Sequence, residues 1–208
     1  MKSLIHYPSA ALALVGLLLA GPLAAQSGDV ERGRGIATGT CIACHGEDGN
    51  GLVPNFPKLA GQHADYLLKQ LQEFAGSRRE NEIMKPIVDA MSAQDMADVS
   101  AYYATQRTSP GQVADATLLE QGRRVYDDGD PEAGVPACAG CHGPRGIGNP
   151  RYPRLAGQYT VYTIDQMQRF ADGRRTNDKR LMQTVAARLG EADTRAVAEY
   201  IASLEPTP

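Results

Sequence analysis

The chain has 208 residues, and its 24 acidic side chains slightly outnumber its 21 basic ones, which gives a formal net charge of −3 at pH 7. This balance lacks the basic excess by which nucleic-acid-binding proteins are recognised, so we expect no nucleic-acid partner. The length permits one domain or two small ones.

The first 25 residues form a predicted export signal. Lys2 is followed by an apolar run from Ala10 to Leu19 and by small residues that end at Ala25. This order is typical of a secretory signal peptide that is cleaved after Ala25. An uncleaved membrane anchor is the weaker alternative, because the run is shorter than the roughly 20 residues of a spanning helix and is interrupted by Gly21 and Pro22.

The pattern Cys-x-x-Cys-His occurs twice, from Cys41 to His45 and from Cys138 to His142. Two thiols at this spacing, with a His directly after the second, are typical of c-type haem attachment through thioethers, with the His as an iron ligand. The predicted attachment residues are Cys41, Cys44, Cys138 and Cys141, and the predicted proximal ligands are His45 and His142. No cysteine lies outside the two motifs.

Each cysteine pair alone is also compatible with a redox disulfide or with half of a zinc site. A zinc ribbon places its second pair roughly 15 to 20 residues after the first, whereas Cys138 follows Cys44 much later in the chain. A thioredoxin-type site requires no His after the second cysteine in both copies. We therefore expect two covalently bound haem c groups. Bacteria attach such haem outside the cytoplasm, and the predicted location is the periplasm.

The two motifs belong to a longer repeat. The segment from Phe56 to Gln62 is answered by Tyr152 to Gln158, with Pro, a basic residue, Leu, Ala, Gly and Gln at matching places. Further matched pairs are Tyr66 and Tyr162, Phe74 and Phe170, Arg78 and Arg174, Arg79 and Arg175, and Asn81 and Asn177. This agreement predicts a duplicated domain. We expect domains at residues 26–107 and 116–208, joined by a Pro- and Gly-containing linker at 108–115.

Each copy is predicted to be all-α. A helix precedes each motif, from Val30 to Thr38 and from Ala116 to Asp127, and a Gly- and Pro-rich loop follows it. Apolar residues at helical spacing predict two later helices per copy, one with Phe74 or Phe170 and a last one with Tyr102 or Tyr200. The second copy carries an insertion, from Asp127 to Ala137, whose role the sequence does not indicate.

The repeat also selects a second iron ligand in each copy. Met84, Met91 and Met96 are candidates in the first copy, and each could instead be a core residue. Alignment of the last helices pairs Met84 with Met182, whereas Met91 and Met96 have no Met partner. We therefore predict that the iron atoms are ligated by His45 and Met84 and by His142 and Met182. His63 is answered by Tyr159, and we interpret it as a surface residue or one that supports a ligand.

The tandem motifs, the repeated Pro-Lys/Arg-Leu-Ala-Gly-Gln segments and the paired Met84 and Met182 resemble the dihaem cytochrome c4 family. The resemblance covers essentially the whole mature chain. It implies two class I cytochrome c domains related by an approximate two-fold axis, with haems close enough for electron exchange. It also implies a periplasmic carrier, soluble or loosely attached to the membrane, that accepts electrons from a quinol–cytochrome c reductase and donates them to a membrane-bound cytochrome oxidase.

Methionine on both irons favours an electron carrier over an enzyme, because it leaves no open position for a small-molecule substrate. The alternatives are the cytochrome subunit of a periplasmic dehydrogenase and a dihaem peroxidase, which would need one accessible iron. Repeated polar residues between each motif and its Met are candidate contacts for the haem propionates, although the arginines could equally be solvated. These candidates are Gln62, Arg78, Gln158 and Arg174.

Overall fold

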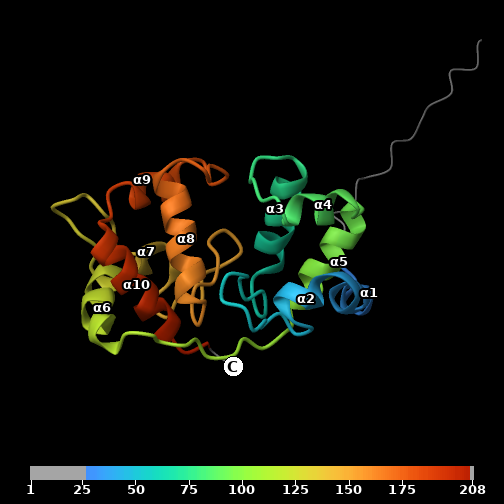
Figure 1. Ribbon diagram of the computed structural model, residues 1–208, viewed down its shortest axis with the longest axis horizontal. Helices are drawn as coiled ribbons and strands as arrows, with labels where there is room; N and C mark the ends of the chain where they lie inside the picture. Colours follow the sequence, from blue (N-terminus) through green and yellow to red (C-terminus); the bar gives the residue numbers. More distant parts are fainter. Residues whose placement is uncertain (1–26, 207–208) are drawn as a thin grey trace, which may run out of the picture.

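The computed structural model describes residues 27–206, and the predicted signal peptide lies outside this range. Two helical lobes stand side by side, α1 to α5 in the first and α6 to α10 in the second (Figure 1). The first lobe contains α1 (Val30–Ile36), the π-helical η1 (Ala37–Cys41), α2 (Ile42–His45), α3 (Ala64–Ala75), α4 (Met84–Asp89) and α5 (Ala93–Ala104). The second contains the 3-10 helix η2 (Ala116–Leu118), α6 (Leu119–Asp127), α7 (Ala139–His142), α8 (Thr160–Ala171), α9 (Leu181–Ala186) and α10 (Glu191–Ser203). The predicted all-α architecture is confirmed.

The first and last helices of each lobe pack closely at a glycine. A Cβ atom on Gly33 of α1 would lie 2.0 Å from the carbonyl oxygen of Asp98 in α5. The matching Gly122 of α6 would place a Cβ 2.1 Å from the carbonyl oxygen of Ala196 in α10. The two lobes therefore share one helix crossing, which any side chain at these glycines would force apart.

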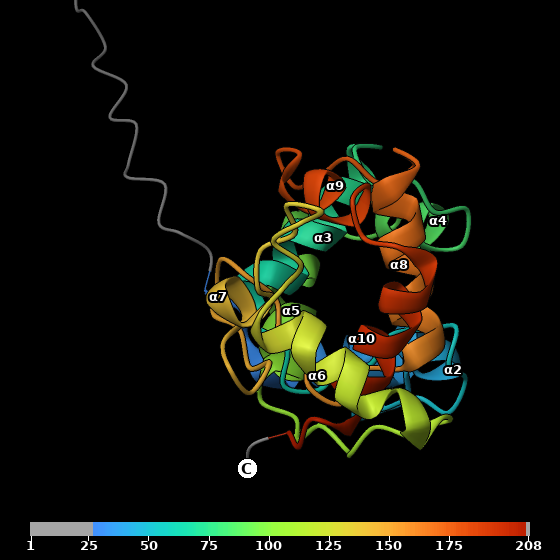
Figure 2. The same cartoon turned by 90° about the vertical axis from the view of Figure 1, so that its left-hand side faces the viewer.

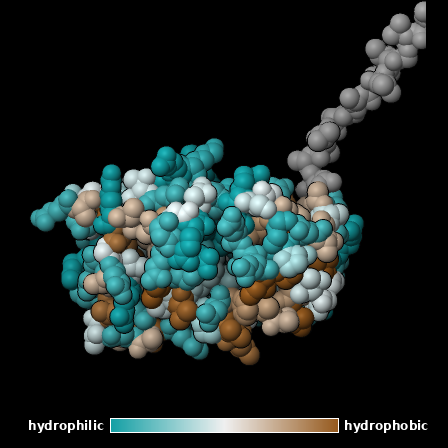
Figure 3. Space-filling view, turned by 45° about the horizontal axis from the view of Figure 1, so that its top comes forward, coloured by the Kyte–Doolittle hydropathy of each residue, from teal (hydrophilic) through white to brown (hydrophobic). Residues whose placement is uncertain are grey.

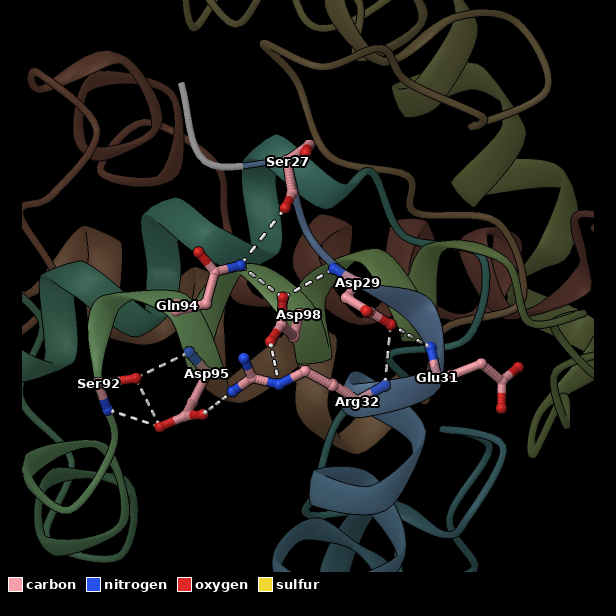
Figure 4. Close-up of polar contacts among 8 residues, drawn as sticks. All are labelled: Ser27, Asp29, Glu31, Arg32, Ser92, Gln94, Asp95 and Asp98. Carbon is pink, nitrogen blue, oxygen red and sulfur yellow. Dashed lines mark hydrogen bonds and ion pairs between the residues drawn. The ribbon is translucent and has the colours of Figure 1, made fainter. Parts of the chain in front are cut away.

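A buried carboxylate fixes the start of α1 against α5 (Figure 4). Asp98 is fully buried, and its Oδ1 accepts hydrogen bonds from the backbone N–H of Asp29 at 2.7 Å and from Gln94 Nε2 at 2.7 Å. Arg32 Nε lies 3.3 Å from the other carboxylate oxygen. Ser92 and Asp95 form a capping box at the start of α5. The Arg32 ion pair offsets the buried charge of Asp98, and the capping box provides partners for backbone N–H groups at the exposed start of α5.

The sequence around the two motifs folds differently in the two lobes. In the first, the predicted helix does not end at Thr38, because η1 continues it directly into α2 and the motif. In the second, the insertion separates α6 from α7. The insertion forms a small turn in which Asp130 pairs with Val135, and Arg188 Nη1 donates to Gly134 O at 3.0 Å. This turn is therefore an anchored part of the second lobe.

The helix next to the lobe boundary is α3 in the first lobe and α8 in the second (Figure 1), and the second lobe lies in front of the first in the view of Figure 2. The backbones of Arg79 and Arg175 form an antiparallel bridge across the boundary. The segment that links the lobes contacts both of them: Lys58 Nζ donates to Ser109 O at 2.9 Å, and the Ala202 carbonyl oxygen would lie 2.2 Å from a Cβ on Gly111. These contacts fix the relative position of the lobes.

The surface in Figure 3 is mostly hydrophilic, with scattered apolar patches. Within residues 27–206, no helix has the length and apolar character needed to cross a membrane.

Candidate haem sites

The four motif cysteines are free thiols in the structure. Burial raises the pKa of the Cys41 thiol and raises the pKa of Cys138 to about 11. Redox-active thiols have a lowered pKa, so these two cysteines lack the electrostatic activation of a thioredoxin-type site. Across the described residues, no three His, Cys, Asp or Glu side chains are grouped as metal ligands. The two motifs lie in separate lobes, at α2 and α7, and so do not combine into one four-cysteine zinc site.

Each motif histidine is buried and held by a backbone carbonyl. His45 Nδ1 lies 2.9 Å from Pro57 O, and His142 Nδ1 lies 2.9 Å from Pro153 O. A carbonyl oxygen only accepts hydrogen bonds, so Nδ1 carries the proton in both rings. Burial lowers the pKa of both histidines, which favours the neutral form. The neutral ring with a proton on Nδ1 leaves Nε2 with a free lone pair, the state that an iron ligand requires.

The loops after the motifs place these carbonyls in the same way. Gly51 N donates to His45 O at 2.7 Å, and Gly148 N donates to His142 O at 2.8 Å. The rings of Phe56 and Tyr152 stand edge-on to the two imidazoles, with centroids 6.1 Å away in both lobes. The local sequence repeat thus gives each predicted proximal ligand the same carbonyl partner and the same neighbouring aromatic ring.

Met84 and Met182 occupy the first turns of the matching short helices α4 and α9. Asn81 Oδ1 accepts from Met84 N at 2.9 Å, and Asp178 Oδ2 accepts from Met182 N. Both side chains are half-buried. Met84 packs against the cluster of Phe74, Val88 and Met96, in which Met96 is buried. The assignment of Met84 and Met182 as iron ligands stays a prediction.

The four residues that we predicted near propionates have protein partners in the structure. Arg78 Nε lies 2.9 Å from Glu73 Oε2 with a side chain 62% exposed, and exposed Arg174 forms an ion pair with Asp172. Gln62 and Gln158 are buried at the lobe boundary, where each bonds to the backbone of the opposite lobe. The contact of these four residues with propionates stays a prediction.

Arg78 and Arg174 are each followed by a second arginine, Arg79 or Arg175, and this second side chain is buried. Arg79 and Arg175 are 9% and 6% exposed, and each stacks over the phenylalanine of its own lobe, Phe74 or Phe170. Their hydrogen bonds go to neutral acceptors in both lobes. Arg79 donates to Gln70 Oε1 (2.8 Å), Tyr162 OH (2.9 Å) and Gln166 Oε1 (2.8 Å), and Arg175 donates to Asn177 Oδ1 (3.2 Å), Gln166 Oε1 (2.7 Å), Tyr66 OH (3.0 Å) and Gln70 Oε1 (3.1 Å).

Two further cations are buried at the boundary, Lys58 and its counterpart Arg154. Burial and the nearby Arg154 lower the pKa of Lys58 to about 8, and burial lowers the pKa of Arg154 to about 10. Among the described residues, the ion pairs of the structure include none that joins these four cations to a carboxylate. Because buried charges need compensation, this boundary is suited to anionic groups such as propionates.

The sequence could have indicated Arg79 and Arg175, since both belong to the repeat. Nothing in the sequence separates the buried arginine of each pair from the exposed one. The buried side chain is determined by the turn after α3 or α8, where Ser77 has a positive φ of 55° and Arg79 N donates to Glu73 O.

Comparison with known proteins also indicates two cytochrome c domains, which together cover most of the described chain. The family model described as Cytochrome c matches residues 30–106 and again residues 119–205. Cytochrome c4 of Thiocapsa roseopersicina is 45% identical over 185 residues, which cover 87% of this chain and 95% of that protein. The crystal structure of reduced recombinant cytochrome c4 from Pseudomonas stutzeri matches with a TM-score of 0.82 at 42% identity, over 86% of this chain and 100% of that one.

A relative with a different name is also similar. The thiosulfate dehydrogenase electron acceptor of Thiomonas intermedia is 38% identical over 175 residues, which cover 81% of this chain and 81% of that protein.

Proposed function

Because the chain belongs to the cytochrome c4 family and is a dihaem electron carrier, we propose that it works in the periplasm and donates electrons to a terminal respiratory oxidase. Its source of electrons in this proposal is a quinol–cytochrome c reductase. Bound haem supplies a one-electron couple between ferric and ferrous iron. The protein supplies the ligands, their orientation and the surrounding charge.

The motif cysteines would hold the two haems through thioethers, Cys41 and Cys44 in the first lobe and Cys138 and Cys141 in the second. His45 and His142 would be the proximal ligands. The observation that carries this assignment is the repeated Nδ1 contact to Pro57 O and Pro153 O, which leaves Nε2 free in both rings. The contact also fixes the plane of each ring, as metal-bound histidines require.

Met84 and Met182 would close the second face of each iron. Their support is the matched position at the start of α4 and α9, each held by a side-chain oxygen one turn earlier. A thioether is a soft neutral ligand that stabilises ferrous iron and raises the reduction potential. Two closed irons suit outer-sphere electron transfer and exclude direct substrate binding.

Arg79 and Arg175 are our choice for the residues that compensate the propionates, in preference to Arg78 and Arg174. The support is burial without a carboxylate partner, together with unused N–H donors on the Arg79 guanidinium. Arg78 and Arg174 are neutralised by acidic neighbours at the surface.

A second candidate function is electron acceptor of a periplasmic dehydrogenase. The observation in its favour is the 38% identity to the thiosulfate dehydrogenase electron acceptor of Thiomonas intermedia. A dihaem peroxidase has less support, because a methionine ligand on each iron would leave no position at which peroxide could bind.

Electron transfer to and from defined partners tests the proposal. The holoprotein, reduced with ascorbate under argon, would be mixed with membrane vesicles that contain an active haem–copper oxidase and with oxygen. We expect rapid reoxidation that an oxidase inhibitor blocks. Reoxidation no faster than in vesicles without the oxidase would refute oxidase donation. Rapid reduction of the oxidised protein by thiosulfate and thiosulfate dehydrogenase would then favour the second candidate.

A further inference from the structure

One peptide unit connects the first proximal histidine to the second lobe. The carbonyl of the Pro57–Lys58 peptide accepts from His45 Nδ1 at 2.9 Å. The N–H of the same peptide donates to Gln158 Oε1 at 2.9 Å, across the lobe boundary. Gln158 Nε2 donates in turn to Lys58 O at 3.0 Å. A continuous hydrogen-bonded chain therefore runs from His45 to Gln158.

The second lobe repeats this arrangement with the roles exchanged. The carbonyl of the Pro153–Arg154 peptide accepts from His142 Nδ1 at 2.9 Å, and its N–H donates to Gln62 Oε1 at 2.9 Å. Gln62 Nε2 donates to Arg154 O at 2.9 Å. Each proximal histidine is thus linked through one peptide to a glutamine of the other lobe.

Both glutamines are held in place by more than these contacts. Gln62 is 5% exposed and Gln158 is 7% exposed. Each Oε1 atom also accepts from the next backbone N–H, His63 N at 3.1 Å and Tyr159 N at 3.0 Å. These bonds fix the orientation of each glutamine amide, so that its oxygen faces the peptide N–H of the opposite lobe.

Hydrogen bonds at the two ends of a peptide strengthen each other, because an acceptor at the N–H increases the negative charge on the carbonyl oxygen. A more negative Pro57 oxygen attracts the Nδ1 proton more strongly and makes His45 Nε2 a better electron donor. Stronger donation stabilises ferric over ferrous iron and lowers the reduction potential.

We propose that Gln158 lowers the reduction potential of the first haem, and Gln62 that of the second, each acting through the peptide that holds the proximal histidine of the opposite lobe. Both are positioning residues, and the inference rests on the proposed axial roles of His45 and His142. The packing of the lobes against each other is then part of what sets each potential.

The test replaces Gln158 with Met, which keeps the side-chain length and removes both hydrogen-bonding groups. The potentials of the two haems in the holoprotein would be followed separately through their haem methyl NMR signals during a redox titration. We expect the first haem to shift to a higher potential while the second stays unchanged, and the His45 Nδ1 proton signal to move. Gln62→Met should raise the potential of the second haem and leave that of the first unchanged.

Tyr159→Phe is the matched control. The Tyr159 hydroxyl donates to Asn50 O at 2.8 Å and to Gly51 O across the same boundary, and neither bond involves the Pro57–Lys58 peptide. Phe keeps the ring that lies 4.9 Å from Lys58 Nζ. Equal shifts in Gln158→Met and Tyr159→Phe, or a Gln158→Met shift confined to the second haem, would overturn the proposal, as would unchanged potentials. In that event, intact low-spin spectra would show that the carrier function itself survives.

If Gln158→Met does not fold, hydrogen exchange in the wild-type holoprotein decides the question. We expect the backbone N–H of Lys58 and of Arg154 to exchange as slowly as the helix-core amides. Fast exchange at both positions would contradict the proposed chains.

Discussion

Arg79 and Arg175 pair through their backbones across the lobe boundary, and their guanidinium groups share the same two glutamine oxygens, on Gln70 and Gln166. Two buried positive charges therefore lie at the boundary between the lobes rather than within one of them. Such charges favour the reduced state of both haems, since reduction removes a positive charge from the iron.

Arg79→Gln is accordingly expected to lower both reduction potentials. A unit charge about 10 Å away contributes about 0.4 kcal/mol in water and about 1.7 kcal/mol at an effective dielectric constant near 20. For one electron these energies correspond to roughly 20 to 70 mV. Spectropotentiometry would measure the shift. Arg78→Gln is the adjacent control, and its exposed ion pair with Glu73 predicts a much smaller change; equal effects of the two variants would exclude the buried pair as the propionate partner.

Removal of the predicted axial thioethers should open one iron at a time. Met84→Ala and Met182→Ala are each expected to convert one haem to a high-spin form with a lower potential, because the soft ligand that stabilises ferrous iron is lost. Absorption and EPR spectra would detect the change. Met91→Ala and Met96→Ala serve as controls for the loss of core volume, and a high-spin haem in Met91→Ala with a normal spectrum in Met84→Ala would reject the assignment.

The helix crossing in the first lobe predicts opposite effects for two glycines of α1. Gly33→Ala should destabilise the protein by about 1 to 3 kcal/mol or more, since the new Cβ would overlap the Asp98 carbonyl. Gly35→Ala meets nothing within 4 Å and should be neutral or stabilising by up to about 1 kcal/mol through helix propensity. Urea unfolding monitored by circular dichroism would compare them. Equal stability of the two variants would show that α1 and α5 can separate at no cost.

The second haem is expected to have the higher potential. Between His45 and Met84 there are four basic and six acidic residues, a net charge of −2, and between His142 and Met182 there are eight basic and three acidic residues, a net charge of +5. Two of the four buried boundary cations, Lys58 and Arg79, fall in the first count and two, Arg154 and Arg175, in the second. They therefore do not change the difference in net charge between the two segments. With exposed charges screened by salt, we expect a gap of several tens of millivolts. Potentials assigned with the Met84 and Met182 variants would check the order, and an equal or higher first potential would disprove it.

The sequence predicted the features that depend on local spacing. The two motifs and the helices around them follow from patterns within a few turns of chain, and the duplicated architecture follows from the repetition of those patterns. The Thr38 boundary was wrong only because η1 carries the helix into the motif. The roles of Gln62 and Gln158 could not be predicted, because their partners lie in the opposite lobe and depend on how α3 and α8 face each other. The repeat marked both glutamines as candidate propionate contacts, which stays a prediction, and it did not indicate their hydrogen bonds to the opposite lobe.

Each chain is expected to carry two covalently attached haems, with both irons closed by protein ligands. A pyridine haemochrome assay on the purified holoprotein, with absorption spectra before and after carbon monoxide is added to the reduced form, tests it most directly. We expect two haem c per chain, low-spin spectra and no change with carbon monoxide. One haem per chain that binds carbon monoxide would contradict it and indicate an open, enzyme-like iron.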